Sequence, residues 1–410
     1  MANSARPASR RPVARLILVG LVAFGLGLGV SIVPTRLGLY PWVLTGQNQI
    51  NLTQFWQVND ILRQKFDGSI DAKKQAQGAV AGMVAALGDP YTTYLTAEQN
   101  KDLNDQLKGT LSGVGIEVGI KNNRLTVIAP VDGTPAARAG IRAGDLIAAI
   151  DGKDSSALTT EQAVKMIRGQ AGTQVKLIIV RPGQQPNEIT LTREQITVPS
   201  VTTEVKAGNI GYIKIREFGA NTVQSLENAT QALMQQGVRA AVIDLRDNPG
   251  GYLDGAVKVS SQFMANGTVV EERSIRESSK KFKALPGGNM TTIPIVVLVN
   301  GGSASASEIT AGALSDNQRA TLVGEKTFGK GSVQEVICLG GFSLASTSSE
   351  NCSTDALKVT VANWFTPNGI NISKEGITPN VEVKLTQDDY NAGRDPQLQK
   401  ALEVAGAKVQ

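Results

Sequence analysis

The feature that most constrains the fold is an alternation of apolar strands and helices over residues 200–385. The runs "AAVID", "IVVLV" and "ATLVG" in this region are short and almost wholly apolar, and helical stretches separate them. Strands without a polar face are typical of parallel sheets that helices cover on both sides. We therefore expect an α/β core with a mostly parallel sheet and a functional site at the carboxyl ends of its strands.

The rest of the chain indicates further domains, since 410 residues exceed one ordinary hydrophobic core. Apolar residues recur at helical spacing before residue 108, whereas short strands and glycines follow it. We expect an α/β multidomain chain with five parts: a basic tail with an apolar segment (1–36), an N-terminal helical region (37–108), a β-rich domain (109–196), the α/β core (197–386) and a C-terminal helical tail (387–410).

The apolar segment at residues 16–33 has no charged residue, and four arginines precede it. As a helix it spans about 27 Å, close to the roughly 30 Å hydrocarbon core of a bilayer. The positive-inside rule then predicts an inner-membrane anchor, with the body in the periplasm or another extracytoplasmic space. A cleaved signal peptide is a competing interpretation, although no A-x-A motif directly follows the run. A buried core helix is a third.

The net charge of +5 does not indicate nucleic-acid binding. Residues 1–36 contain five arginines and no acidic residue, which leaves 36 basic residues to balance 36 acidic ones in the body. No basic stripe is evident there, and aromatic residues make up only 4% of the chain. We expect no nucleic-acid partner.

The absence of histidine excludes several kinds of catalytic site. A Ser-His-Asp triad and histidine zinc sites are impossible, and two cysteines alone cannot build a thiolate metal site. We expect neither a metal nor a cofactor. In an oxidising compartment, Cys338 and Cys352 are candidates for a disulfide that closes a small polar loop, with two free thiols as the alternative.

Two apolar strands end in motifs suited to catalysis. "VIDLRDNPGG" ends in Gly250 and Gly251, which can turn backbone N–H groups toward a ligand. "VVLVNGGSASASEI" ends where a helix begins, and Ser305-x-x-Glu308 fits a capping box. A serine at a helix N-terminus also lies where free N–H groups stabilise a developing oxyanion, so a cap and a nucleophile are compatible roles for Ser305.

A serine nucleophile in this chain needs a base other than histidine. "GEKTFGKGSVQEV" offers Lys326 and Lys330, and Lys330 lies between glycines, two residues after Phe328. A partly apolar site would lower the pKa of Lys330 and supply a neutral amine, as a Ser-Lys dyad requires. The spacing alone is equally compatible with a solvated lysine on a glycine-rich loop.

The segment "GTPAARAGIRAGDLIAAIDG", at residues 133–152, resembles the PDZ domains of bacterial proteases. The resemblance assigns residues 109–196 to a PDZ domain and implies that a peptide C-terminus adds to it as an extra strand. Backbone N–H groups of the preceding loop would hold the terminal carboxylate. That loop comprises Ser112, Gly113, Val114, Gly115 and Ile116. Plain turn geometry is the alternative explanation for its glycines.

Together with "DPYTTYL", these motifs resemble the carboxyl-terminal processing, or tail-specific, proteases over roughly residues 50–385. The resemblance implies an endopeptidase that recognises the exposed, apolar C-termini of substrate proteins and acts through a Ser-Lys dyad and an acyl-enzyme. Ser305 is then the nucleophile, Lys330 the base, and Gln334 the residue that positions the lysine. The backbone N–H groups of Gly251 and Ala306 form the oxyanion hole.

The same resemblance implies a crotonase-like fold, also found in ClpP, for the core, and structural roles for Ser303 and Ser307. A homodimer formed through the N-terminal helices is one of the alternatives for the oligomeric state. A PDZ-bearing adaptor without activity is the alternative function, and a crotonase-like acyl-CoA enzyme would not explain the PDZ segment. Three features depart from the family pattern: the insert between the cysteines, the segment "TPNGINIS", and Asn380 where an acidic residue is common.

Overall fold

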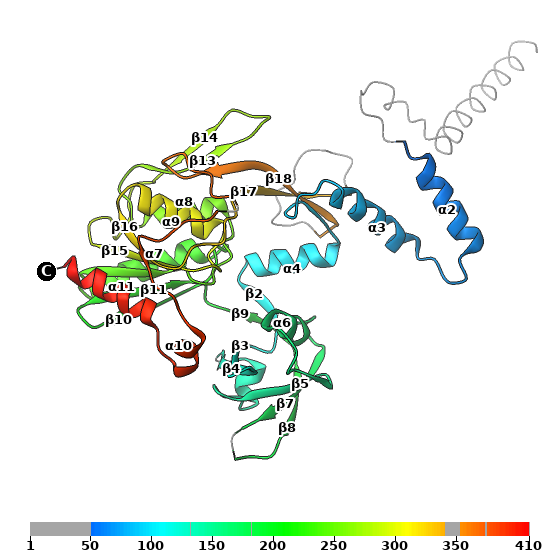
Figure 1. Cartoon of the computed structure of the whole chain (residues 1–410), viewed down its shortest axis with the longest axis horizontal. Coiled ribbons are helices and arrows are strands. Elements are labelled where there is room, and N and C mark those ends of the chain that lie inside the picture. Colours follow the sequence, from blue (N-terminus) through cyan, green and yellow to red (C-terminus); the bar gives the residue numbers. More distant parts are fainter. Residues whose placement is uncertain (1–50, 132, 182, 341–352, 374, 410) are drawn as a thin grey trace, which may run out of the picture. The chain divides into compact units, whose positions relative to one another are not determined.

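The computed structural model describes residues 51–409 except 132, 182, 341–352 and 374 (Figure 1). By its internal contacts the chain divides into Met1–Ala79 and Val80–Gln410. The predicted anchor at residues 16–33 lies outside the described part. Within that part, no helix is both long and apolar enough to cross a membrane.

Helix α2 (Thr53–Lys65) is the helix that lies wholly within the first unit, among the residues described there. It carries several apolar side chains, yet none of its residues is buried. Phe55 and Trp56 make an edge-to-face ring contact on its first turn, and each is 43% exposed. Helix α3 (Ala72–Ala85) follows it in the chain.

The core is built on a six-stranded sheet with the order β10-β11-β12-β15-β16-β19. All neighbouring pairs are parallel except β10–β11. The prediction of a mostly parallel sheet is therefore confirmed. Its strands are β10 (Val201–Lys206), β11 (Ile210–Ile215), β12 (Ala240–Asp244), β15 (Ile295–Val299), β16 (Ala320–Gly324) and β19 (Val381–Glu382).

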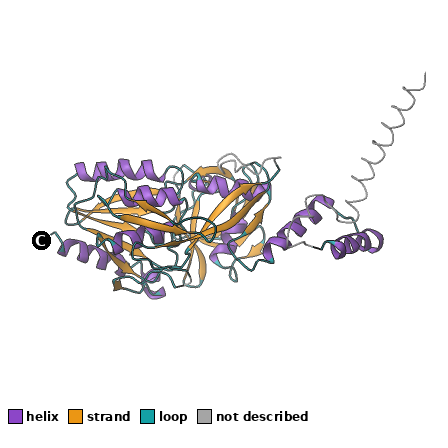
Figure 2. Ribbon diagram, turned by 90° about the horizontal axis from the view of Figure 1, so that it is seen from above, coloured by secondary structure: helices purple, strands orange, loops and turns teal. Residues whose placement is uncertain are grey.

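Helices cover both faces of this sheet, as Figure 2 shows. Alternate residues of the central strands point to opposite faces. Val242 and Val296 pack with Ala401 and Ala405 of α11 (Pro396–Ala407). On the other face, Ile243 and its counterparts pack against three helices. These are α7 (Thr222–Gln235), α8 (Leu253–Ser261) and α9 (Ala306–Asp316). Burial on both faces explains why the strands have no polar side.

A second, antiparallel sheet also belongs to the core and carries Gln334, one of the catalytic candidates. Strand β18 (Ala356–Phe365) pairs with β17 (Ser332–Cys338), with β13 (Thr268–Arg273) and with the short β1 (Thr93–Leu95). Strand β14 (Lys280–Lys283) extends β13 as a hairpin. Helix α4 (Ala97–Leu107) follows β1 and begins with a capping box between Thr96 and Gln99.

The β-rich region has its own hydrophobic core. Its larger sheet has the order β3-β4-β5-β7-β8, with β6 paired to β5, and its smaller sheet pairs β2 with β9. The strands are β2 (Thr110–Gly113), β3 (Ile116–Lys121), β4 (Arg124–Pro130), β5 (Leu146–Ile150), β6 (Lys153–Asp154), β7 (Gln174–Val180), β8 (Asn187–Thr192) and β9 (Glu194–Thr197). Helices α5 (Pro135–Arg138) and α6 (Thr160–Ile167) belong to the same region, and α10 (Gln387–Ala392) precedes α11.

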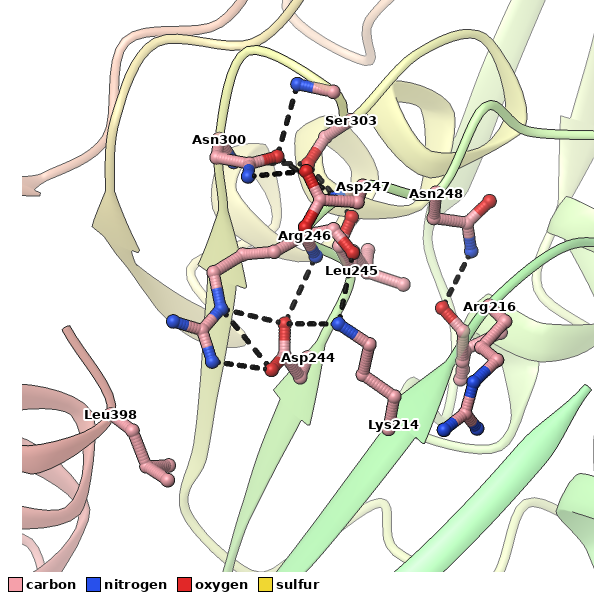
Figure 3. Close-up of polar contacts among 12 residues, drawn as sticks. Lys214, Arg216, Asp244, Leu245, Arg246, Asp247, Asn248, Asn300, Ser303 and Leu398 are labelled. Carbon is pink, nitrogen blue, oxygen red and sulfur yellow. Dashed lines mark hydrogen bonds and ion pairs between the residues drawn. The ribbon is translucent and has the colours of Figure 1, made fainter. Parts of the chain in front are cut away.

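A buried polar cluster fixes the chain where β12 ends (Figure 3). Arg246 turns back onto Asp244 with an Nη2–Oδ2 distance of 2.6 Å, and its guanidinium also donates to Asp395 at the start of α11. Burial would raise the pKa of Asp244, but the hydrogen bonds from Arg246 and the charge of Lys214 hold it below its usual value. The cluster ties the loop after β12 to helix α11.

Candidate active site

Ser305 lies at the corner between β15 and α9, one residue before the helix begins. Its φ is 56° and its ψ is −115°, a combination that residues with a side chain rarely adopt. Such a backbone conformation costs on the order of 1–3 kcal/mol and persists where the surroundings determine it. Ser305 is partly exposed, whereas Ala304 and Ala306 are buried. The corner therefore presents this one hydroxyl to solvent at the helix N-terminus.

The neighbouring serines are buried and serve the fold. Ser303 donates to the carbonyl of Leu245 at 2.8 Å and accepts from the N–H of Asn300. Ser307 donates to the carbonyl of Asn248 at 2.9 Å. Both residues are 0% exposed. Their bonds fasten the Ser305 corner to the loop after β12, which agrees with the structural roles expected for them.

The turn at Gly250 and Gly251 packs directly against this corner. Gly250 has φ +100°, and an added Cβ would lie 2.8 Å from the Ser305 Cβ and 2.9 Å from the Ala306 nitrogen. At Gly251, with φ +146°, it would lie 2.3 Å from the carbonyl oxygen of Phe218. Only glycine fits at either position. The Ala306 N–H at the start of α9 adjoins this turn. It is one of the first N–H groups of the helix, which have no partner within the helix.

Asn248 holds the glycine turn in place. It is 0% exposed, and its side chain donates to the Ile215 carbonyl at 2.8 Å and accepts from the Gly250 N–H at 2.9 Å. Its own carbonyl accepts from the N–H of Ala304 and from the Ser307 hydroxyl. One residue thus joins the end of β11, the glycine turn and the start of α9. No motif in the sequence indicated this role.

Glu308 connects the serine corner with the lysine loop. Its buried carboxylate accepts the N–H of Ser305 at 2.9 Å through Oε2, and the same oxygen accepts the N–H of Lys330 at 2.9 Å. The other oxygen accepts from the Thr327 hydroxyl and the Gly329 N–H. The capping motif indicated the first bond. No signal in the sequence indicated the bonds to a loop some twenty residues downstream.

Lys330 is held by its backbone, and its side chain is partly buried. Its carbonyl accepts from the indole N–H of Trp364 at 3.0 Å. Burial lowers the pKa of the Lys330 amine, the charge of Lys358 lowers it further, and the charge of Glu308 opposes both. Phe328, two residues before Lys330 in the chain, is 56% exposed. Its two neighbours, Thr327 and Gly329, both donate to the Glu308 carboxylate.

All five residues predicted for catalysis line one cavity of about 680 Å³. They are Ser305, Lys330, Gln334, Gly251 and Ala306. The Gln334 amide nitrogen donates to the hydroxyls of Ser332, at 2.8 Å, and Thr360, at 3.4 Å. Apolar side chains from several elements also line the cavity, and these include Leu107, Leu253, Ile309, Val333 and Trp364. A peptide-sized site with apolar walls thus surrounds Ser305 and Lys330.

The predicted carboxylate loop is shorter than expected. Ser112 and Gly113 pair with Gln195 and Glu194 in the β2–β9 sheet, and Ile116 already belongs to β3. Only Val114 and Gly115 connect the two strands, and Val114 is 1% exposed in the core of the β-rich region. The pairing with β9, distant in the sequence, explains the difference. Strand β3 is an edge strand of its sheet, with β4 as its partner among the described residues.

Two further predictions concern the periphery of the core. Cys338, at the end of β17, takes part in a disulfide, while Cys352 lies outside the described residues. The Asn380 side chain accepts from the N–H of Leu322 at 2.7 Å, so this departure from the family pattern still ties the chain before β19 to the middle of β16. Within the described ranges, no group of cysteine and acidic side chains has the arrangement of a metal site.

Comparisons with known proteins agree with this architecture. Models for peptidase family S41, for a PDZ domain and for the N-terminal domain of the activating protease CtpB match residues 209–383, 126–181 and 44–99. A carboxy-terminal-processing protease of Bartonella bacilliformis is 40% identical over 365 residues, covering 87% of this chain and 81% of that protein. A carboxyl-terminal-processing protease of Synechocystis is 36% identical and covers 90% and 86%.

Among solved structures, the photosystem II D1 C-terminal processing protease is similar over 87% of this chain and 92% of its own. The two share 29% sequence identity with a TM-score of 0.52. The motifs that carry the sequence resemblance lie in the regions that these family models match. The chain belongs to the carboxy-terminal processing proteases of peptidase family S41, serine proteases that carry a PDZ domain.

Proposed function

We propose that this protease cleaves its substrates with a Ser-Lys dyad. Neutral Lys330 takes the proton of the Ser305 hydroxyl as its oxygen attacks the scissile carbonyl carbon. The peptide C–N bond then breaks, and the leaving amine receives that proton. Water next attacks the acyl-enzyme, with Lys330 again as the base, and releases Ser305. The observation that carries the proposal is that strained Ser305 and Lys330, whose pKa burial lowers, line the same cavity.

The oxyanion of each tetrahedral intermediate would be bound by the N–H groups of Gly251 and Ala306. The close approach of the glycine turn to the start of α9 supports this pair. Preorganised donors of this kind are worth about 10²- to 10³-fold in kcat. Gln334 would position the Lys330 amine during turnover. Its amide nitrogen bonds to Ser332 and Thr360, which supports a fixed orientation of its side chain.

Substrate recognition would combine this site with the PDZ domain. A protein C-terminus with apolar residues would add as a strand at the edge of β3, and the backbone from Ser112 to Ile116 would hold its carboxylate. The edge position of β3 supports this mode of binding. A PDZ-bearing adaptor without activity is the alternative function, and cleavage of casein would distinguish the two.

The setting of the enzyme is part of the same proposal. Residues 16–33 would anchor it in the inner membrane and leave the body in the periplasm or an equivalent space. A cleaved signal peptide is the alternative for this segment. The exposed apolar residues of α2 are compatible with a homodimer through an N-terminal helical region. The core would have a crotonase-like fold, and the domains would have the boundaries predicted from the sequence.

The decisive experiment measures cleavage of an unstructured protein with an apolar C-terminus. Ser305→Ala and Lys330→Ala should bind this substrate with wild-type affinity and leave it uncut. Ser303→Ala is the matched control within the same motif, since that hydroxyl is buried and serves the fold. It should lose stability but keep a measurable turnover. Wild-type turnover by either dyad variant would exclude the mechanism.

A further inference from the structure

The segment "DPYTTYL", at residues 89–95, has no part in the chemistry proposed above, yet the structure brings one of its rings against the amine of Lys330, a residue that lines the catalytic cavity. Its last three residues form β1, which pairs with β18 through the register Thr93–Lys358 and Tyr94–Leu357. The Tyr94 hydroxyl bonds to the Asp355 carboxylate, which also accepts the N–H of Ala97 at 2.7 Å. These bonds seat the segment on the sheet that contains β17.

Tyr91 reaches the predicted base directly. The amino nitrogen of Lys330 lies over the Tyr91 ring, 5.3 Å from the ring centroid. An aromatic face at this distance attracts an ammonium group and also displaces water from it. The Lys330 backbone is already fixed by Glu308 and Trp364, so the ring bounds the remaining freedom of the side chain.

The beginning of the segment is also linked to Gln334, the residue expected to position the lysine. Asp89 accepts the Thr92 hydroxyl at 2.6 Å and the Tyr91 N–H at 3.1 Å, which closes a tight turn. The Thr92 hydroxyl then accepts the N–H of Thr360 at 3.0 Å. Thr360 in turn accepts from the Gln334 amide. A chain of hydrogen bonds therefore runs from the turn to Gln334.

We propose that Tyr91 is a positioning residue for catalysis, whose ring holds the Lys330 amine in the cavity and shields it from water. The Asp89–Thr92 turn fixes the ring and, through Thr360, the amide of Gln334. The inference rests on the Ser-Lys mechanism proposed above. It assigns to the Lys330 side of the active site an aromatic residue contributed from before the PDZ domain in the chain.

The influences on the pKa of Lys330 determine in which direction the loss of the Tyr91 ring shifts that pKa. Burial and the charge of Lys358 on β18 lower its pKa, and the carboxylate of Glu308 on α9 raises it. Removing the ring admits water, which favours the ammonium form. The acid limb of kcat/KM, which reports the base of the free enzyme, then moves to higher pH. The ring's own attraction for the ammonium opposes this movement, so an upward shift requires that the exclusion of water by the ring outweighs that attraction.

The test compares variants of Tyr91 by the pH profile of kcat/KM. Tyr91→Ala should shift the acid limb upward and lower kcat/KM at pH 7 about tenfold, as a one-unit shift in a base requires. Tyr91→Phe keeps the ring and should follow the wild-type profile. Tyr91→Leu keeps an apolar side chain, should fall between them, and serves if Tyr91→Ala does not fold. Thermal unfolding of each variant verifies the fold.

The matched control is Tyr94→Phe, which keeps the ring on β1 and removes only the hydroxyl that bonds to the Asp355 carboxylate. It should lower thermal stability and leave the acid limb in place. An equal limb shift in this control, equal losses for Tyr91→Phe and Tyr91→Ala, or a wild-type profile for Tyr91→Ala would each overturn the proposal.

A second readout separates this inference from the dyad itself. In a Ser305→Ala background, Lys330 is acylated with a soluble amine-reactive reagent at a series of pH values, and mass spectrometry measures the extent. Because only the neutral amine reacts, this pH dependence reports the neutral fraction of Lys330 without proteolysis. Tyr91→Ala should move this curve to higher pH. Full activity of Lys330→Ala would refute the dyad, whereas an inactive Lys330→Ala with unchanged Tyr91 variants would refute only the role of Tyr91.

Discussion

The serine side and the lysine side of the cavity are held in different ways. On the serine side, buried polar residues hold the corner by hydrogen bonds, and Asn248, Ser303, Ser307 and Glu308 are all 0% exposed. On the lysine side, Glu308 and Trp364 hold the backbone of Lys330, whereas its amine lies over the ring of Tyr91.

This difference follows from what each proposed group must do. A nucleophile needs a fixed position beside its oxyanion donors, and directional hydrogen bonds supply it. A lysine base needs a lowered pKa, which burial and a nearby positive charge supply without a specific bond to the amine. The fold thus controls geometry on one side and protonation on the other.

Glu308→Gln should break both sides at once and have the largest effect. The Glu308 carboxylate accepts four hydrogen bonds, and the glutamine NH₂ would face two of these donors, for instance the N–H groups of Ser305 and Lys330. Two buried donors without acceptors should lower the free energy of unfolding by about 2–5 kcal/mol and abolish most turnover. Urea unfolding and peptide cleavage measure this. Glu382→Gln, which changes an exposed side chain of β19, is the control. Equal free energies of unfolding for Glu308→Gln and Glu382→Gln would contradict the role of Glu308.

Asn248→Ala should break only the serine side. Losing the bonds to Ile215 and Gly250 should lower the free energy of unfolding by about 1–3 kcal/mol. A looser glycine turn should lower kcat by about 10- to 100-fold with little change in KM, because oxyanion binding matters only in the transition state. Asn363→Ala, on an exposed position of β18, should change neither quantity. A change in KM with an unaltered kcat would argue against this role for Asn248.

Lys330→Met tests, through the free energy of unfolding, whether burial of the Lys330 ammonium costs stability. Because the folded pKa of Lys330 is lowered, the wild type carries a full penalty below that pKa, where both states are protonated. The penalty disappears as pH rises toward the unfolded value of about 10.4. The variant should therefore be more stable near neutral pH, on the order of 1 kcal/mol, and the difference should narrow toward pH 10. Urea unfolding at several pH values tests this, with exposed Lys326→Met as control.

Lys358→Gln should have the smallest effect and act on protonation alone. Its like charge lowers the pKa of Lys330, so its removal raises that pKa. The acid limb of kcat/KM should move to higher pH by less than about one unit, because solvent screens charges around an open cavity. Turnover on the alkaline plateau should stay the same. Lys400→Gln on α11 is the control, and a shift of the Lys358→Gln limb toward lower pH would contradict the expected sign.

Much of the site followed from sequence motifs because each motif is local. The corner at Ser305 and the turn at Gly250 and Gly251 need particular residues over a few consecutive positions, and those residues are visible in the sequence. The parallel sheet followed from its apolar strands for the same reason. The shortened loop after Ser112 did not, because it depends on pairing with β9 some eighty residues later.

By itself, the sequence determined which chemistry is available, since a chain without histidine needs another base for a serine, and it located the candidate groups at strand ends. Only the tertiary structure decided what surrounds them. The contacts of Glu308 with Lys330, of Asn248 with Ile215, and of Tyr91 with Lys330 join residues far apart in the chain. Burial and long-range hydrogen bonds depend on how the sheets pack, and no local pattern of residues encodes them.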